Sequence, residues 1–185
     1  MTRTLILFVS VLIAGPAFAD HHEMPKPITP GPEHAFTKSG SGNWDVKQKM
    51  WHKPGAPPME ATGKMVAQAV MNGIGLAYEY TGDKQGEMPI FRGYGFTTWI
   101  PAKKHYESVW FDVFSYGGMT RSTGTWDEKT KTLTEAMSGP GPDGKPVNFK
   151  VVTVYPNNDG HTQTFFMKKD GKEMKTMELV YTRAK

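Results

Sequence analysis

Short runs of aromatic, β-branched and threonine residues, each ended by a turn signal, constrain the fold of this chain most. After Gly42 such runs follow one another to the C-terminus. Val, Ile, Thr and aromatic residues are enriched in strands, whereas Gly, Pro, Asn and Asp mark turns. We find no sustained period of three or four residues that would indicate a long helix. The pattern predicts an all-β domain with ten strands, near 43–51, 61–71, 75–82, 89–100, 104–113, 116–126, 131–138, 147–155, 161–169 and 172–183.

The connections between these runs are short, which predicts how the strands pair. Residues 52–58 hold Pro54, Gly55 and Pro57 and cannot continue a hydrogen-bonded ladder. Asn72-Gly73 is typical of a hairpin turn. Short connections favour pairing of each strand with its sequence neighbours, and closure of the sheet removes its exposed edges. We therefore predict a single closed antiparallel up-and-down barrel of about ten strands, wide enough to leave internal space.

The N-terminal segment has the pattern of a secretory signal peptide. Arg3 precedes an apolar run over residues 5–14, and Ala17-Phe18-Ala19 has the small-x-small form of a cleavage site. The run is shorter than the roughly 20 residues of a membrane-spanning helix. We expect a periplasmic or secreted protein without membrane attachment after cleavage. The predicted organisation is a signal peptide at 1–19, a flexible Pro/Gly/His-rich leader at 20–41 with one helical turn near 33–38, and a barrel domain at 42–185.

Composition narrows the function classes. The chain has no cysteine, which excludes thiolate catalysis and cysteine-ligated metal sites. Its formal charge of +4 comes without a basic block, so nucleic-acid binding has little support. The Gly-x-Ser-x-Gly, His-Glu-x-x-His and phosphate-loop motifs are missing, and an enzyme is therefore the less favoured reading. Candidate inward carboxylates are Asp45, Asp112 and Glu178, for which ion pairs with Arg92, Arg121 or Arg183 are favoured over catalysis.

Two residues at the ends of the predicted barrel resemble a known signature. Gly42-Asn43-Trp44 opens the first strand, and Arg183 lies near the end of the last one. This pair resembles the calycins, the superfamily of lipocalins and fatty-acid-binding proteins, in which a Gly-x-Trp and a late cationic residue meet at one barrel end. A guanidinium over an indole face gains cation–π energy there. We expect Trp44 and Arg183 to close one end; the alternative is that both are unrelated surface residues.

A second resemblance covers almost the whole predicted domain, from about Gly42 to Arg183. It is to domain-of-unknown-function family 1579, and it implies a lipocalin-like barrel but no particular activity. One departure, Trp99-Ile100-Pro101, stands where a Tyr-Asp pair is expected. The motifs that carry the resemblance are Gly42-Asn43-Trp44-Asp45, Trp51 with Pro54-Gly55-Ala56-Pro57-Pro58, Tyr78-Glu79-Tyr80, Phe91-Arg92-Gly93-Tyr94-Gly95-Phe96, Tyr106, Trp110-Phe111-Asp112 and Met177-Glu178-Leu179-Val180-Tyr181-Thr182-Arg183.

Aromatic residues on the predicted strands suggest a binding cavity. Tyr and Trp combine an apolar body with a polar tip, which suits a small, partly apolar ligand. The residues predicted to line the cavity are Tyr78, Tyr80, Tyr94, Phe96, Trp110 and Tyr181. The alternative is plain core filling. Three functions stay open: a small-ligand-binding barrel, which we favour, an enzyme acting in the same cavity, and a structural or interaction module. The oligomeric state and any cofactor are not predicted.

Histidines suggest two further sites. Related nitrobindin barrels hold haem through a late-strand His, for which His161 is the candidate here. It follows a hairpin turn, so we expect it to be exposed, like His52 and His105. If cleavage follows Ala19, the mature chain begins Asp20-His21-His22, and His21 and His22 could join a square-planar Cu(II) or Ni(II) site. The alternative is an accidental His pair in a flexible leader.

Overall fold

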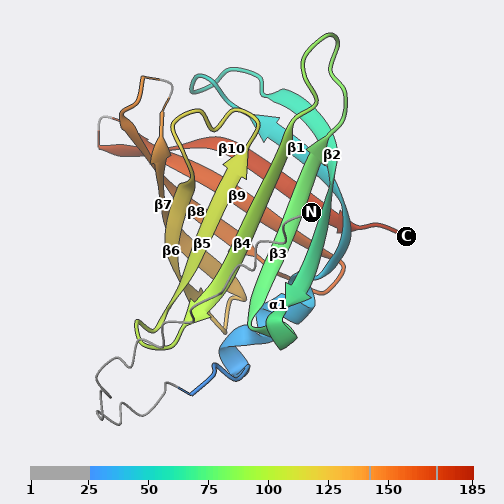
Figure 1. Cartoon of the computed structure of the whole chain (residues 1–185). Helices are drawn as coiled ribbons and strands as arrows, with labels where there is room; N and C mark the ends of the chain where they lie inside the picture. The colour runs from blue at the N-terminus through green and yellow to red at the C-terminus, as the bar shows by residue number, and fades with distance from the viewer. Residues whose placement is uncertain (1–25, 142, 170) are drawn as a thin grey trace, which may run out of the picture.

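Ten antiparallel strands close into one barrel (Figure 1). The computed structural model describes residues 26–141, 143–169 and 171–185. The predicted signal peptide and the His21–His22 site lie outside these residues. The predicted all-β up-and-down barrel is confirmed, and each strand pairs with its neighbours in sequence. The strands are β1 Gly42–Met50, β2 Met59–Val70, β3 Gly75–Gly82, β4 Arg92–Ile100, β5 His105–Asp112, β6 Thr120–Asp127, β7 Thr132–Pro140, β8 Pro146–Val154, β9 Gly160–Lys169 and β10 Lys172–Arg183.

The first and last strands complete the ring. β1 pairs with β10 from Trp44↔Arg183 to Met50↔Met177. The Arg183 guanidinium carbon lies 4.3 Å from the centre of the Trp44 ring, so the predicted contact between these residues is present. Because neither terminal strand keeps an unpaired edge, the barrel needs no covering element along its side.

A short helical segment covers one end of the barrel, here called the helix end. The segment consists of a 3₁₀ turn at Pro32–His34 and α1 at Ala35–Gly40. Its Phe36 side chain is buried and meets the Tyr106 ring edge-on at 5.2 Å. The helical turn predicted near 33–38 is therefore present. The flexible leader is wrong over residues 32–40, because burial of Phe36 binds this segment to the barrel.

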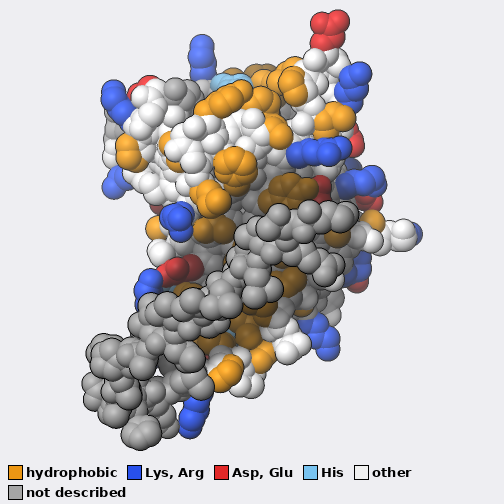
Figure 2. All heavy atoms as spheres, viewed as in Figure 1, with side chains coloured by type: hydrophobic (Ala, Val, Ile, Leu, Met, Phe, Trp, Pro, Cys, Tyr) orange, Lys and Arg blue, Asp and Glu red, His pale blue; other side chains and the backbone are white. Residues whose placement is uncertain are grey.

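The opposite end, here called the loop end, carries the connections 51–58, 83–91 and 113–119. Figure 2 shows hydrophobic side chains gathered on this part of the surface. Exposed apolar residues there are Met88, Ile90, Val113, Phe114, Tyr116 and Met119. Among the described residues, no helix has the length and apolar character needed to cross a membrane.

The interior is built by strand alternation, with large rings placed over glycines. A Cβ added to Gly93 would collide with Cζ2 of Trp110, and one added to Gly95 would collide with Cε2 of Tyr78. These two inward positions of β4 thus carry no side chain, and aromatic rings from β3 and β5 fill the space over them. Side chains alternate along a strand, so the intervening Tyr94 and Phe96 point outward.

Candidate functional site

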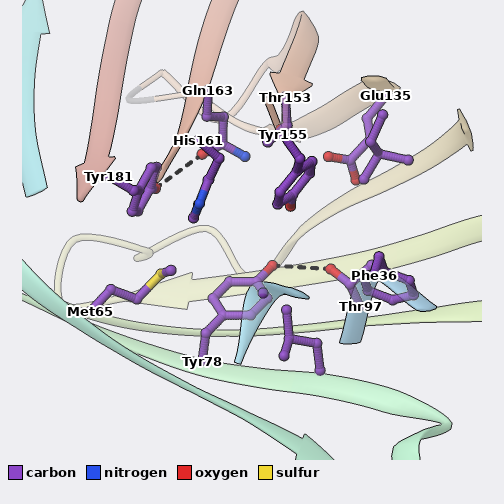
Figure 3. A pocket seen from close by; sticks show the side chains of 13 residues that line it. Phe36, Met65, Tyr78, Thr97, Glu135, Thr153, Tyr155, His161, Gln163 and Tyr181 are labelled. Atoms are coloured by element: carbon purple, nitrogen blue, oxygen red, sulfur yellow. Dashed lines mark hydrogen bonds between the residues drawn. The ribbon is translucent and has the colours of Figure 1, made fainter. Parts of the chain in front are cut away.

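A cavity of ≈ 70 Å³ lies inside the helix-end half of the barrel (Figure 3). It has room for a few water-sized groups. Its lining mixes apolar side chains with hydroxyl, amide, imidazole and carboxylate groups, and it contains one acidic residue and no Lys or Arg. The lining residues are Phe36, Gly40, Met65, Leu76, Tyr78, Thr97, Leu133, Glu135, Thr153, Tyr155, His161, Gln163 and Tyr181.

Glu135 on β7 holds a carboxylate in this interior. The residue is 7% exposed. The hydroxyls of Ser108 and Ser122 both donate to its Oε1, each at 2.7 Å. Ser108 also shares a 2.8 Å hydrogen bond with Thr97, whose hydroxyl lies 3.3 Å from that of Tyr78. A chain of hydroxyls from neighbouring strands therefore fixes Oε1, while Oε2 has no hydrogen-bond partner among the described residues.

Glu135 has no ion-pair partner in the described part of the chain. A buried carboxylate is normally paired with a cation or strongly hydrogen-bonded, because removing it from water is unfavourable. The two serine hydroxyls supply part of that stabilisation. They leave the negative charge without a counter-ion at the cavity wall.

His161 projects from the start of β9 between two tyrosine rings. Its ring is stacked on Tyr181 at 4.1 Å and on Tyr155 at 4.9 Å, with interplanar angles of 11° and 24°. Trp44 meets it edge-on at 4.7 Å. His161 is 6% exposed, and its Nδ1 has no hydrogen-bond partner among the described residues. Burial, assisted by the charge of Arg183, lowers the His161 pKa to about 4, so the imidazole is neutral at neutral pH.

The expected exposure of His161 is wrong. β9 already begins at Gly160, so the ladder places the next side chain inside the barrel rather than in the turn. His34 of the helical segment is likewise buried, with its Nε2 unpartnered among the described residues, whereas His52 and His105 differ from His161. His52 is exposed, as predicted, and its Nε2 contacts the Met59 sulfur. His105 is partly exposed and lies 3.1 Å from a Glu107 carboxylate oxygen.

The cavity tyrosines stay uncharged. Burial raises the pKa of Tyr78, Tyr155 and Tyr181. For Tyr78 and Tyr155 the negative charge of Glu135 adds to that effect on the pKa. Tyr181 donates its hydroxyl hydrogen to Gln163 at 3.3 Å. With neutral tyrosines and a neutral imidazole, Glu135 dominates the electrostatics of the cavity.

An outer groove of ≈ 240 Å³ adjoins this cavity at the helix end. Phe36 and Tyr155 line both spaces and form the boundary between them. The groove runs between the helical segment and the connections 128–131 and 155–158. Its full lining is Pro32, Glu33, Ala35, Phe36, Ser39, Tyr106, Trp126, Glu128, Lys131, Tyr155, Pro156, Asn157 and Asn158.

The polar and aromatic part of the groove lining consists mainly of rings and carboxylates. The Trp126 indole nitrogen donates to Glu128 Oε2 at 2.7 Å, and its ring lies 5.8 Å from that of Tyr155. A hydrogen bond from Lys131 lowers the pKa of Glu128 and partly neutralises its charge. Glu33 supplies a second carboxylate, while its backbone carbonyl accepts the Tyr106 hydroxyl at 2.7 Å.

The structure divides the predicted ligand-lining residues into three groups. Tyr78 and Tyr181 line the cavity. Tyr80 and Trp110 point inward but lie outside the cavity lining, where Trp110 stacks on Tyr78 at 6.0 Å. The predicted lining role of Tyr94 and Phe96 is wrong, because both occupy outward positions of β4 and Tyr94 is 56% exposed. Gly93 and Gly95, which flank Tyr94, occupy the inward positions of β4 and therefore place Tyr94 on the outer face.

Sequence reasoning missed several lining residues: Glu135, Tyr155 and Gln163. Glu135 had a usable signal, because Leu133, Glu135 and Met137 alternate on one face of a strand. A carboxylate between two apolar residues on the same face indicates an inward charge. Tyr155 follows β8 and Gln163 lies within β9, and neither has a comparable local signal.

The three carboxylates that the sequence suggested as inward groups make hydrogen bonds and ion pairs outside the cavity. Asp45 lies on the surface and pairs with Lys64 at 2.7 Å. Asp112 accepts hydrogen bonds from the Trp110 indole and the Phe114 backbone. Glu178 pairs with Lys175 at 2.5 Å. None of the three lines the cavity, and no hydrogen bond joins Glu135 to His161 within the described residues. No group of three potential metal-ligating residues occurs there either.

A haem does not fit this cavity. Sites for drug-sized ligands have several hundred Å³, and a porphyrin is at least that large. The cavity of ≈ 70 Å³ is far smaller. Both faces of the His161 ring are covered by tyrosines, and Phe36 of α1 occupies the adjoining space. His161 therefore acts here as part of an aromatic wall.

Comparison with known proteins agrees with this architecture. The family model described as "Protein of unknown function (DUF1579)" matches residues 29–183. The chain belongs to the DUF1579 family. The match includes the helical segment as well as the strands, so the cover of the helix end is part of the DUF1579 domain.

One solved structure extends the DUF1579 comparison at the level of the fold. Rv2717c from M. tuberculosis is similar with a TM-score of 0.59 and 14% identity, covering 85% of this chain and 100% of that protein. A redesigned beta barrel reaches a TM-score of 0.44 with 11% identity, covering 80% of this chain and 95% of that one. No curated protein matches the chain. The likeness to Rv2717c shows a shared barrel fold and leaves the activity to be argued from the site.

Proposed function

We propose that this DUF1579 barrel is a binding protein for a small, partly apolar molecule held in the inner cavity. The observation that carries the proposal is the fixed polar site at Glu135, inside the core. Two serine hydroxyls orient its carboxylate, and apolar walls from Met65, Leu76 and Leu133 face the same space. Ligand pockets have this composition, with mostly apolar walls and a few placed polar groups.

The energetics favour a functional reading of these polar groups. Replacing a buried charge and its partners by well-packed apolar residues is often neutral or stabilising. A barrel interior that served only to fold would not need a carboxylate and two serine hydroxyls there, since apolar residues at all three positions could fill the space. The interior hydroxyl chain and the unpartnered imidazole nitrogen of His161 instead present polar atoms to a small space.

The helix end offers the entry route. A column of stacked rings, Trp110 on Tyr78 and Phe91 on Trp110, fills the interior toward the loop end. Phe36 and Tyr155 separate the outer groove from the cavity, since both side chains line both spaces. A rotation of Phe36 on the short helical segment would therefore connect the two spaces.

Export is part of the proposal. The support is the signal-peptide pattern of residues 1–19. N-terminal sequencing of the protein recovered from the producing cell should begin at Asp20. A chain that retains Met1 and stays in the cytosolic fraction would overturn this part alone.

The binding function can be tested with a methionine reporter inside the cavity. Met65 lines the cavity, whereas Met88 is 60% exposed at the loop end. With ¹³C-methyl methionine, a bound molecule should shift the Met65 signal and leave Met88 in place. Mass spectrometry of small molecules released on denaturation would identify what co-purifies.

Matched variants control for non-specific binding. Thr153→Leu adds bulk at a cavity-lining position, and Thr134→Leu adds the same bulk on the exposed face of β7. The first variant should lose the co-purified molecule and the second should keep it, with both folded by circular dichroism. If no small molecule is released and no fragment of any charge shifts Met65, the proposal is wrong.

A further inference from the structure

We infer that the ligand of this cavity is a small organic cation, an alkylammonium or amidinium, whose charge lies against Glu135. The inference rests on the proposed binding function and names its ligand class. Its observation is a buried carboxylate that lines a small cavity without a counter-ion among the described residues. The ligand would supply the missing positive charge.

The hydrogen bonds of Glu135 leave one oxygen free for a ligand. Oε1 already accepts the hydroxyls of Ser108 and Ser122. Oε2 accepts none among the described residues and is free for an N–H donor. Charge-assisted hydrogen bonds of this kind are shorter and stronger than neutral ones.

The charges around the cavity favour a cation over an anion. Arg183 acts on the cavity wall through its charge, which helps burial to lower the pKa of His161. Its guanidinium is committed elsewhere, because it lies over the Trp44 ring and donates to the carbonyls of Ser41 and Asn158 at 3.0 and 2.6 Å. An anion would meet the Glu135 charge with no Lys or Arg in the cavity lining to offset it. Like charges in a low-dielectric interior repel strongly.

The aromatic walls also suit a cation. Tyr155 and Tyr181 flank the cavity together with Tyr78 (Figure 3). Ammonium groups are attracted to the faces of such rings, most strongly when both partners are desolvated. A cavity of ≈ 70 Å³ limits the ligand, or the head group that enters, to a few non-hydrogen atoms.

The outer groove has a matching electrostatic character. Glu33 and Glu128 line it, while Lys131 is the single Lys or Arg of its lining and is bound to Glu128. Trp126 and Tyr155 add ring faces along the same path. A cation approaching the helix end therefore meets carboxylates and aromatic rings before it reaches Glu135.

A charge series of nearly identical shape tests the inference. Acetamidinium, acetamide and acetate differ mainly in charge, and each can be titrated at constant ionic strength while the Met65 methyl signal is followed. Acetamidinium should shift Met65 and saturate. Acetamide should bind about tenfold or more weakly, because it can donate an N–H to the carboxylate but brings no opposite charge to pair with it. Acetate should not bind.

Two variants that each remove one negative charge test whether the preference for acetamidinium depends on Glu135. Glu135→Gln should abolish the preference for acetamidinium over acetamide, whereas Glu87→Gln, in an exposed loop, should keep it. If Glu135→Gln does not fold, Ser122→Ala gives a second measurement. Loss of a donor that stabilises the ionised carboxylate should lower acetamidinium affinity severalfold while leaving acetamide affinity nearly unchanged, and equal losses for both probes would contradict the inference.

The outcomes separate this inference from the binding function itself. Equal binding of acetamide or acetate, or a preference for acetamidinium over acetamide that survives Glu135→Gln, shows that Glu135 does not select a cation, while the binding function itself still stands. If none of the three probes shifts Met65, the inference that the ligand is a cation is also wrong. Fragments of other chemistry that shift Met65 would still support the binding function.

Discussion

The helix end and the loop end of the barrel are closed in different ways. At the helix end, Trp44 is 1% exposed, donates its indole N–H to the Gly40 carbonyl at 3.0 Å and lies under Arg183. At the loop end, Tyr116 is 92% exposed and Met88 is 60% exposed. The helix end is covered by a segment held through specific contacts, and the loop end is filled from within by stacked rings.

This difference coincides with the location of the candidate site. The cavity, the Glu135 carboxylate and the outer groove all lie toward the helix end, where buried hydrogen bonds hold polar groups in fixed positions. The loop half is a packed aromatic core with apolar residues left on its connections. We therefore expect substitutions at the helix end to have large effects on stability and those on the exposed loops to have small ones.

Removal of Trp44 should give the largest effect. Trp44→Ala deletes a fully buried indole together with its contacts to Gly40, His161 and Arg183, and should lower the free energy of unfolding by about 3–5 kcal/mol. Chemical denaturation followed by circular dichroism measures this change. A loss below about 1 kcal/mol would show that the helix end is not the anchor of the fold.

Acid should weaken the protein through His161. The pKa of its imidazole is about 4 in the folded chain, against 6.5 for a histidine in the unfolded chain, so the ring is neutral in both states at higher pH. Between these values the unfolded chain takes up a proton and the folded chain does not. The free energy of unfolding should therefore fall as pH drops from about 6.5 to about 4, by up to about 3 kcal/mol, and His161 should add no further loss below that.

Two histidine variants isolate this contribution. His161→Gln should flatten the dependence of unfolding free energy on pH in this window. His52→Gln, at an exposed position of the loop end, should leave it unchanged. An identical slope in wild type and His161→Gln would place the acid sensitivity elsewhere.

Loss of the guanidinium should have a smaller effect than loss of the indole. Arg183→Ala removes the cation–π contact and hydrogen bonds to the Ser39, Ser41 and Asn158 carbonyls. Because this side chain is about one-third exposed, we expect a loss of about 1–3 kcal/mol in urea denaturation. Arg183→Lys should recover only part of it, since Lys lacks the planar fork of donors.

The exposed loop end should tolerate change. Tyr116→Ser alters a side chain that is 92% exposed, and the free energy of unfolding should stay within about 0.5 kcal/mol of wild type. Thermal melting of the two proteins side by side measures it. A loss as large as that of Arg183→Ala would mean that the two ends do not differ as described.

Much of the architecture follows from local sequence patterns. Turn signals such as Asn72-Gly73 and the Pro-rich 52–58 segment delimit strands, and short connections imply pairing of neighbours. The Trp44–Arg183 contact was predictable because the two ends of a closing sheet must meet. The helical turn near 33–38 was predictable too, but its burial against Tyr106 was not, since a local pattern does not show what a segment packs against.

The sequence by itself determined that this chain forms a closed ring of ten strands with Trp44 and Arg183 at the seam. The tertiary structure decided which face of each strand points inward, and with it that Glu135 and His161 lie inside while Tyr94 and Phe96 lie outside. The physical reason is that strand alternation has a period of two. Its phase depends on neighbouring strands, here on the Trp110 and Tyr78 rings that lie over Gly93 and Gly95.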